Sequence, residues 1–565
     1  LRTQFGADLS DYTRSFYRAN TLLYRTASEG EPYAQSGSAR SFSWLSENTL
    51  TYDRDYGDHS INSVLGFTAQ KERNDLNSII AQNFPDDEVP TVNGGQVTDG
   101  TSTAEEWSLL SYLARVNYSY QQKYLVTATL RADRSSRFGE NNQTGVFPSA
   151  SVGWRLSDEP FLQNVSSLSD LKVRASYGVT GNFLIPNYGS FGLLDSEDYV
   201  GGTGQNVISG VAPRSIGNDD LTWETTRELN IGLDAGFVNN RVTLAADYYS
   251  STTSDLLLNV SLPSATGFET FLTNIGEVEN QGLEFVLSTE NLIGEFSWST
   301  DRNFGTNRNE VTELGPEGAP ILSSGAAGPR HITRIGDEIG SYYGYVVAGV
   351  YRDQADLDSA VPDREAPDPR PGDFKFKDVN GDGEITPADR TVTGSYFPDF
   401  TYGITNRFQY RGFDLNIFLQ GVEGREILNL TSRHMKNGEA NFNSYAIFTE
   451  RWRSPEEPGN GEIPRADRQT GLHGNNNRPS SFQVEDGSYL RLRNVTLGYS
   501  FPITFLGSET RRARIYLAGQ NLFTITDYLG FNPEVNLQST PLTPGEDYGA
   551  YPLSRVYTLG VDFTF

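Results

Sequence analysis

The sequence predicts an all-β fold, a transmembrane antiparallel β-barrel of which this chain supplies about sixteen strands. Three observations lead to this prediction. The last strand is apolar on one face and polar on the other, tight turns alternate with long connections, and no stretch approaches the roughly 18 apolar residues of a membrane-spanning helix.

The chain ends on a segment that resembles the closing strand of a membrane barrel, because alternate side chains are apolar and the last one is aromatic. The apolar face of this segment carries Tyr557, Leu559, Val561, Phe563 and Phe565. The other face carries Thr558, Gly560, Asp562 and Thr564. A half-buried strand of a soluble sandwich shares this feature, so other parts of the chain are needed to distinguish the two folds.

The composition agrees with a β-barrel and excludes several functions. The 565 residues include 30 Tyr, 32 Phe and 56 Gly, which suit strands, aromatic girdles and tight turns. There is no cysteine, which excludes disulfides, a thiol nucleophile and a thiolate metal site. The formal net charge of -27 argues against nucleic acid as a partner and fits solvated acidic loops and divalent cations.

Alternation with a period of two marks the individual strands. In residues 124–133, for example, Tyr124, Val126 and Leu130 share one face, while Thr127 and Arg131 share the other. The predicted strands are residues 1–17, 39–54, 58–75, 104–120, 123–134, 147–157, 169–179, 222–237, 241–257, 277–290, 295–313, 399–410, 413–421, 487–501, 511–526 and 553–565.

Short and long connections alternate between these strands. The tight turns are predicted at Tyr56-Gly57, Gln121-Gln122, Asn239-Asn240 and Arg411-Gly412, with medium turns at 158–168 and 502–510. The long connections are residues 76–103, 180–221, 314–398 and 422–486. Outer-membrane barrels have short turns at the periplasmic rim and long loops outside, whereas a soluble sandwich has no reason for this pattern. We therefore expect all the long connections to be extracellular.

Several motifs appear in an order that resembles one family. They are Ser111–Tyr120 (SYLARVNYSY) followed by Lys123-Tyr124-Leu125, Arg131–Gly139 (RADRSSRFG), Phe147–Trp154 (FPSASVGW), Ser176–Asn182 (SYGVTGN), Trp223-Glu224, Asn274-Ile275-Gly276, Asn280–Glu284 (NQGLE), Ser488–Asn494 (SYLRLRN) and Gly519–Phe523 (GQNLF). Along nearly its whole length the chain resembles the C-terminal part of SusC/RagA-type TonB-dependent outer-membrane transporters.

The resemblance implies a plugged barrel of about 22 strands, of which residues 1–565 would be the last sixteen. A strand pattern is already under way at Leu1, so we expect the plug domain and the first strands to be absent from this chain. The family further implies a multi-pass barrel in the lipid of the bacterial outer membrane, a plug that receives force from the TonB complex, and a SusD-like surface lipoprotein over the long loops.

Residues 378–389 form a D-x-N-x-D-G-x-I-x-x-x-D pattern within the large predicted loop 314–398. This pattern is typical of an EF-hand-like calcium loop. Asp378, Asn380 and Asp382 would offer side-chain oxygens, Glu384 its backbone carbonyl, and Asp389 would close the loop. We expect a structural Ca²⁺ that stiffens the loop. An acidic turn that holds no ion is the alternative.

No catalytic constellation is found in the sequence, so we do not expect an enzyme. The four histidines are His59, His331, His434 and His473. None shares a strand face with a suitable serine and acid, and no pair has zinc-ligand spacing.

Other polar and aromatic groups have ordinary structural explanations. The aromatic run Tyr342–Tyr345 and the pair Tyr248-Tyr249 fit packing under loops or an interfacial girdle better than sugar stacking. Arg131, Asp133 and Asp247 could line a polar lumen, form ion pairs that brace the wall or contact the plug. The acids of the large loop, namely Asp353, Asp356, Asp358, Asp363, Glu365 and Asp368, are expected to be solvated.

The sequence thus predicts TonB-dependent import of oligomeric nutrients, glycan or peptide, through the outer membrane. A passive porin-like barrel, or a structural barrel in a larger envelope assembly, is the alternative. The residues that contact substrate are not identifiable from the sequence.

Overall fold

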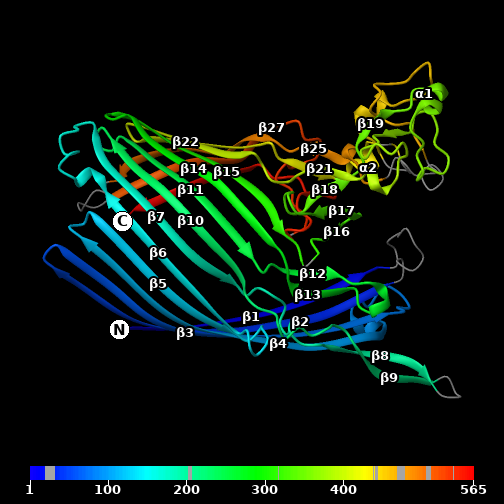
Figure 1. Ribbon diagram of the computed structural model, residues 1–565, viewed down its shortest axis with the longest axis horizontal. Helices are drawn as coiled ribbons and strands as arrows, with labels where there is room; N and C mark the ends of the chain where they lie inside the picture. The colour runs from blue at the N-terminus through cyan, green and yellow to red at the C-terminus, as the bar shows by residue number, and fades with distance from the viewer. Residues whose placement is uncertain are drawn as a thin grey trace. The chain divides into compact units, whose positions relative to one another are not determined.

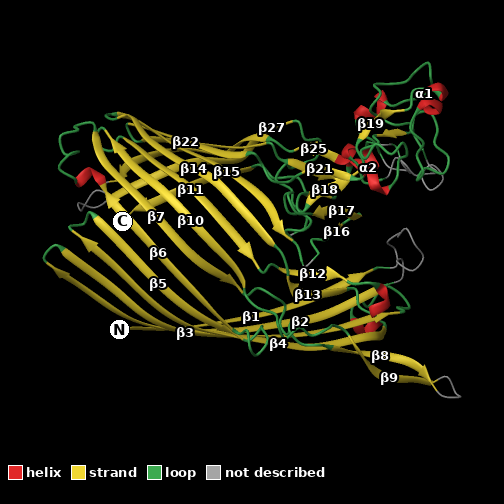
Figure 2. Ribbon diagram, in the orientation of Figure 1, coloured by secondary structure: helices red, strands yellow, loops and turns green. Residues whose placement is uncertain are grey.

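The computed structural model describes residues 1–19, 32–201, 206–315, 317–436, 438, 443–467, 478–503, 511–538 and 540–564. Strands dominate this part of the chain, and the helices are short pieces within the connections (Figure 2). No described helix is long and apolar enough to cross a membrane.

Among the described residues, sixteen strands form one antiparallel sheet. Each of these strands pairs with the next of the sixteen along the chain. The sheet consists of β1 (Arg2–Arg18), β2 (Tyr33–Tyr56), β3 (His59–Gln82), β4 (Gln96–Tyr120), β5 (Tyr124–Ser135), β6 (Thr144–Arg155), β7 (Leu168–Asn182), β10 (Glu224–Phe237), β11 (Val242–Ser254), β14 (Glu277–Leu292), β15 (Phe296–Glu313), β22 (Phe400–Tyr410), β23 (Phe413–Glu423), β26 (Tyr489–Ile503), β27 (Arg511–Thr526) and β29 (Val556–Thr564). The prediction of an all-β antiparallel fold is therefore confirmed.

The remaining elements lie in the connections. They are η2 (Val92–Gly94), η3 (Leu156–Asp158), β8 (Leu194–Gly201), β9 (Asn206–Pro213), β12 (Leu257–Ser261), η4 (Ser264–Thr266), β13 (Thr270–Asn274), β16 (Ile321–Gly325), β17 (Gly328–Thr333), β18 (Ser341–Gly344), β19 (Val347–Val350), α1 (Gln354–Ser359), β20 (Phe374–Phe376), η5 (Pro387–Asp389), β21 (Thr391–Gly394), β24 (Glu426–Asn429), α2 (Ser432–Met435), η6 (Ala446–Glu450), η8 (Ser481–Gln483), β25 (Val484–Asp486) and β28 (Glu546–Asp547).

The tight turns fall where the sequence predicts them. Arg411 and Gly412 alone separate β22 from β23, and both have positive φ values, of 45° and 87°. Positive φ at both central residues is the mark of a type I′ hairpin, whose twist matches that of the paired strands. Gln121 and Gln122 also adopt positive φ, at 53° and 55°. The predicted turn 502–510 lies mostly outside the described residues.

The predicted apolar faces are exposed in this chain. On β29, Tyr557 is 70% exposed and Leu559 75% exposed, and Val126 and Leu130 are exposed on β5. Apolar side chains in such regular rows face lipid in a membrane barrel, which is why they need no partner within the protein.

One predicted loop is mostly strand. Residues 76–103 were expected to form a loop, but β3 continues to Gln82 and β4 begins at Gln96. The pattern conceals these strand ends because polar and apolar side chains mix on both faces there. Pairs such as Ser78 with Thr101 continue the ladder, and Ser102 donates a hydrogen bond to Asn77 Oδ1 at 2.7 Å. An extended hairpin in water needs no apolar alternation to keep its backbone paired.

The contacts divide the chain into two compact units. The first comprises Leu1–Trp154, Ser176–Glu228 and Thr253–Ile275, and the second comprises Arg155–Ala175, Leu229–Thr252 and Gly276–Phe565. In the second unit, the connections after β15, β23 and β27 gather at one end of the strands (Figure 1). They form small sheets of their own, including the three-stranded sheet β25-β24-β28. The described parts of these connections are therefore folded.

The connections of the first unit have their own apolar core. It consists of Phe138, Phe147, Ile185, Leu221 and Trp223, all buried. Leu257 of β12 and Leu272 of β13 pack against it. The Trp223 indole N–H donates to the carbonyl of Gln143 at 3.2 Å, so its polar atom is satisfied inside this core.

We predict that Leu221→Ala loosens this core. Leu221 is fully buried, and truncation of such a leucine costs about 2–5 kcal/mol through lost burial and the cavity left behind. Amide hydrogen exchange of residues 183–221 in the membrane-embedded protein should accelerate accordingly. Leu194→Ala, at a site that is 63% exposed, is the matched control and should leave exchange unchanged. Equal protection in both variants would contradict this account of the loop core.

Candidate functional site

The predicted calcium loop forms a compact turn between β20 and β21 of the second unit. Asp378 lies at its start, where Oδ1 accepts a hydrogen bond from the backbone N–H of Gly381 at 2.7 Å and Oδ2 accepts one from Gly383 at 2.9 Å. Gly381 and Gly383 have φ values of 75° and 87°, which favour glycine. The chain thus wraps around the first carboxylate, as the sequence pattern requires.

The next two oxygen-bearing side chains follow the same local pattern. Asn380 Oδ1 accepts from the N–H of Asp382, and Asp382 Oδ1 accepts from the N–H of Glu384, both at 2.9 Å. The carboxylate of Glu384 forms an ion pair with Arg364. This leaves the backbone carbonyl of Glu384 as the group that the calcium prediction uses.

Asp389, at the closing position, is fully buried. Its Oδ1 accepts from the N–H of Val379 and its Oδ2 from the N–H of Thr386, each at 2.8 Å. Burial raises the pKa of Asp389, but the hydrogen bonds from Thr386, Val379 and Asn380 outweigh it and hold the pKa below its usual value. Asp389 is therefore a carboxylate that ties the two ends of the loop together.

The loop has the donors for Ca²⁺ without a preformed cluster of acids. Within the described residues, no group of three or more His, Cys, Asp or Glu side chains is placed to hold a metal ion. Each carboxylate has about four lone-pair positions, so Asp378 and Asp389 keep acceptor capacity beyond their backbone hydrogen bonds. Calcium binding at this loop stays a prediction.

Two acids of the large loop are not solvated as expected. Asp363 is buried and pairs with Arg478 at 3.1 Å, and Asp356 pairs with Lys375 at 2.9 Å. Neither partner is a direct neighbour in the sequence, so the sequence pattern around each acid shows only its charge. The pair of Asp363 with Arg478 holds the large loop against the segment that precedes β26, whereas the pair of Asp356 with Lys375 lies within the large loop.

The aromatic run Tyr342–Tyr345 packs under the loops. Tyr342 is 1% exposed and its hydroxyl donates to the carbonyl of Glu426 at 3.0 Å. Tyr345 is also buried, next to Phe374, Phe376 and Ile385. This arrangement agrees with packing and leaves neither ring face open to a ligand.

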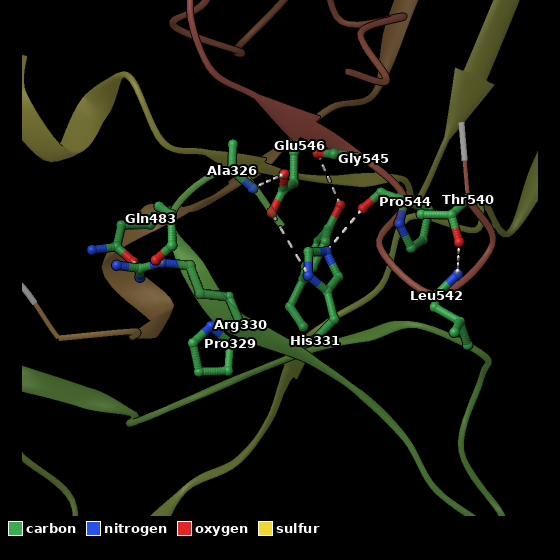
Figure 3. A network of polar contacts seen from close by, with 12 residues as sticks. Ala326, Pro329, Arg330, His331, Gln483, Thr540, Leu542, Pro544, Gly545 and Glu546 are labelled. Atoms are coloured by element: carbon green, nitrogen blue, oxygen red, sulfur yellow. Dashed lines mark hydrogen bonds and ion pairs between the residues drawn. The ribbon is translucent and has the colours of Figure 1, made fainter. Parts of the chain in front are cut away.

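A buried polar contact that sequence reasoning missed joins two of these connections (Figure 3). His331 of β17 and Glu546 of β28 are both fully buried, and His331 Nδ1 lies 3.7 Å from Glu546 Oε1. His331 Nε2 contacts the carbonyl of Pro544 at 3.2 Å, and Glu546 Oε2 accepts from the N–H of Ala326 at 2.9 Å. Pro544 is 213 residues beyond His331, which is why no local motif reveals the contact.

The environment shifts both groups toward their neutral forms. Burial lowers the pKa of His331 to about 4, with a further contribution from Arg330, while the contact with Pro544 opposes the shift. Burial also raises the pKa of Glu546, against the N–H of Ala326 and the charge of Arg330. His331 is therefore neutral near neutral pH, and burial shifts the pKa of Glu546 in the direction that favours its neutral form.

The charged residues on the strands form ion pairs along the wall. Arg131 Nε pairs with Asp133 at 2.7 Å, and a guanidinium nitrogen of Arg174 pairs with Asp247 at 2.6 Å. Of the three interpretations of Arg131, Asp133 and Asp247, these distances favour ion pairs that brace the wall. A face with such pairs is polar, opposite the exposed apolar face of the same strands.

Three residues of the motifs quoted above form hydrogen bonds in the connections of the first unit. Asn182 donates to Glu224 at 3.1 Å, and the other oxygen of Glu224 accepts from the N–H of Leu257 at 3.2 Å. Asn274 exchanges two hydrogen bonds with the backbone of Thr222, both at 2.8 Å. These motifs therefore fix the connections to the strand ends, which is a structural role.

Comparisons with known proteins agree with this architecture. Residues 1–522 match the family model of the TonB dependent receptor-like β-barrel. The chain is 38% identical, over its whole length, to TonB-dependent receptor P3 of Formosa agariphila, and it covers 56% of that protein. It is 31% identical to TonB-dependent receptor SusC of Bacteroides thetaiotaomicron, over 83% of this chain and 45% of SusC.

The fold also matches a solved transporter. The RagAB peptide importer in its "closed-closed" state superposes on the whole chain with a TM-score of 0.81 at 25% identity, and the match covers 60% of that structure's chain. A large antiparallel sheet with exposed apolar rows on one face and polar side chains on the other is typical of an outer-membrane β-barrel. This chain belongs to the TonB-dependent receptor family of such barrels. It spans about half the length of the curated relatives it matches.

We predict that protonation of His331 destabilises the buried region around its contact with Glu546. A histidine has an ordinary pKa near 6.5, so a folded-state pKa of about 4 means that stability is lost as the pH falls from 6.5 toward 4. The loss is at most about 3 kcal/mol, because the raised pKa of Glu546 acts in the opposite direction. Hydrogen exchange of β16 and β17, corrected for intrinsic rates, should rise over this interval.

The control distinguishes protonation of His331 from other effects of low pH on the protein. His331→Gln should remove the pH dependence of exchange in β16 and β17, whereas His59→Gln should retain it. A pH dependence that is the same in His331→Gln and in the natural protein would show that another group controls this region.

Proposed function

We propose that this chain is the barrel part of a TonB-dependent outer-membrane transporter that imports oligomeric nutrients, glycan or peptide. The 38% identity to a TonB-dependent receptor over the full chain carries this proposal. The sheet agrees with it, because its exposed apolar rows suit lipid and its ion-paired face suits an aqueous interior.

The proposal assigns no chemical reaction to the protein. Import consists of binding and release, coupled to conformational change by a plug that the TonB complex pulls. We assign the plug to the part of such a transporter outside these 565 residues. The folded connections of the second unit would present a firm surface to a SusD-like lipoprotein, because they have apolar cores such as Tyr342, Leu428 and Leu430.

We predict that import by the full-length protein depends on cellular energy. Cells that carry the gene should deplete short glycans or peptides from their medium, and deletion of the gene should abolish uptake of the affected class. An uncoupler that removes the proton gradient should have the same effect, because TonB transmits the energy of that gradient. Uptake can be followed by mass spectrometry of the medium.

The same experiment tests the alternative barrel functions. A passive porin-like barrel would continue to admit the same molecules after uncoupling, at a rate set by their concentration. A structural barrel would show no change of uptake after deletion. Either result would contradict the transporter proposal.

We further propose that residues 378–389 bind Ca²⁺ and stiffen the large loop. The donors at Asp378, Asn380 and Asp382 have the required spacing, and the loop already curls around Asp378. Bound Ca²⁺ would be held by these side chains, the carbonyl of Glu384 and Asp389. It would supply only positive charge and rigidity.

We predict that Ca²⁺ stabilises the full-length protein through this loop. At a concentration about 100 times its dissociation constant, a ligand that binds only the folded form adds about 2.7 kcal/mol. Thermal unfolding of the detergent-solubilised protein should shift upward with Ca²⁺, and Asp378→Ala should remove the shift. Asp368→Ala, in an exposed pair with Arg370 outside the loop, is the matched control. An equal shift in both variants would refute the assignment.

A further inference from the structure

A cavity of about 850 Å³ lies at the loop end of the sheet in the second unit. Strands β14, β15, β22 and β23, the first three of which are labelled in Figure 1, form its floor, and β26 borders it. Residues of the connections complete its wall: Tyr396 before β22, Arg425 after β23 and Glu534 after β27. Its volume is within the range of sites for small molecules and short oligomers.

Two cross-strand rows make up the floor. Glu284 is paired with Gly305 and Gly305 with Thr401, while Asn303 is paired with Gly403 and Gly403 with Gln420. Residues in such rows point to the same face of the sheet. A Cβ on Gly305 would find only Thr401 Oγ1 within 4 Å, at 3.7 Å, so the space above this glycine is open.

The polar side chains of the floor are available to a ligand. In the described part of the chain, those of Glu284, Asn303, Thr401 and Gln420 make no hydrogen bond or ion pair. They present one carboxylate, two amides and one hydroxyl group. Such a set of donors and acceptors complements a ligand rich in hydroxyl groups.

Arg425 brings a positive charge that has no acidic partner among the described residues. Its guanidinium carbon lies 4.6 Å from the centre of the Tyr396 ring, and its buried Nε has no hydrogen-bond acceptor. A buried donor without an acceptor is unfavourable, and an anionic ligand at the guanidinium would supply acceptors. The planar guanidinium suits the bidentate geometry of a carboxylate or a sulfate.

The other charged side chains of the wall are paired with one another. Glu534 pairs with Arg493 at 3.0 Å and also forms an ion pair with Arg491. Burial disfavours ionisation of Glu534, but these arginines hold its pKa below the usual value. Arg425 and Glu284 are therefore the charged side chains of the cavity that have no ion-pair partner among the described residues.

The strands of the cavity floor have no free edge, which favours recognition of a ligand by their side chains. Strands β14, β15, β22 and β23 each pair with a neighbour on both sides, so none offers a free edge to an extended peptide. Peptide recognition by strand addition needs such an edge. A hydroxyl-rich ligand that binds to side chains fits the floor better than a peptide backbone.

We propose that this cavity binds an acidic oligosaccharide, with Arg425 as the group that binds its carboxylate or sulfate. Asn303, Thr401, Gln420 and Glu284 hold the hydroxyl groups of the sugar. The inference rests on the proposed import function and names the class of nutrient within it. It places the determinant of charge selectivity on the barrel wall and its adjoining loops.

The test is calorimetric titration of the full-length transporter with four probes of similar length. These are an oligogalacturonate, a sulfated galacto-oligosaccharide, a neutral galacto-oligosaccharide and an oligoglutamate peptide. We expect one of the two acidic sugars to bind at least about tenfold more tightly than the neutral one. The sugar that binds identifies the anionic group as carboxylate or sulfate.

Substitution then tests the residue. Arg425→Gln should weaken binding of the acidic sugar by about ten- to a hundredfold, the range expected for a lost charge-assisted hydrogen bond. Arg425→Lys should lie between, because the charge remains without the fork geometry. Arg433→Gln removes an arginine outside the cavity in the same connection and should bind as the natural protein does.

Several results would overturn the proposal. They are equal affinity for acidic and neutral sugars, no binding of any acidic sugar, binding of the peptide alone, or an unchanged affinity in Arg425→Gln. The comparison of acidic with neutral sugar uses the natural protein, so it decides even if Arg425→Gln does not fold. Energy-dependent uptake of neutral sugars or peptides, with no uptake of either acidic sugar, would refute this site and leave the import function intact.

Discussion

The pairing of backbone hydrogen bonds within lipid is the constraint on which the rest of the structure depends. An unpaired N–H or C=O in hydrocarbon costs several kcal/mol, so each strand must pair with a neighbour along its membrane-spanning length. A shift of one residue would turn a whole apolar row, such as Tyr557, Leu559 and Val561, away from lipid. The ladder therefore fixes the register, and the register fixes which side chains reach each face and each strand end.

The connections extend this order beyond the membrane by ordinary burial. Phe138, Leu221 and Trp223 form a core in the first unit, and Ile427, Tyr528 and Val535 form one in the second. Hydrogen bonds that Asn182 donates and that Glu224 and Asn274 accept attach the first core to strand ends. Loops that carry their own cores keep a definite shape in water, which allows polar groups such as Asp363 and Arg478 to be buried as pairs.

The sequence predicts the features that repeat and misses those that depend on distant partners. Alternation and tight turns locate all sixteen sheet strands, and the Arg411-Gly412 hairpin lies where expected. The ends of β3 and β4 were missed because residues outside lipid do not alternate. His331 with Glu546, and Arg425 with Tyr396, combine residues from separate connections, so only the folded chain shows their burial or lack of partners. The calcium motif is local, which is why its residues could be named from sequence.

The strands of such a barrel wall cannot easily move past one another. This restricts the conformational changes that the protein can undergo. The central strands have hydrogen bonds on both sides, and no intermediate between two registers keeps them paired in lipid. Ion pairs such as Arg131 with Asp133 and Arg174 with Asp247 add local bracing. Conformational change must then occur in parts that are attached to the wall at their ends only. A side chain such as Arg425, just beyond the last residue of β23, lies at the boundary between the fixed ladder and those parts, where a bound ligand can contact both.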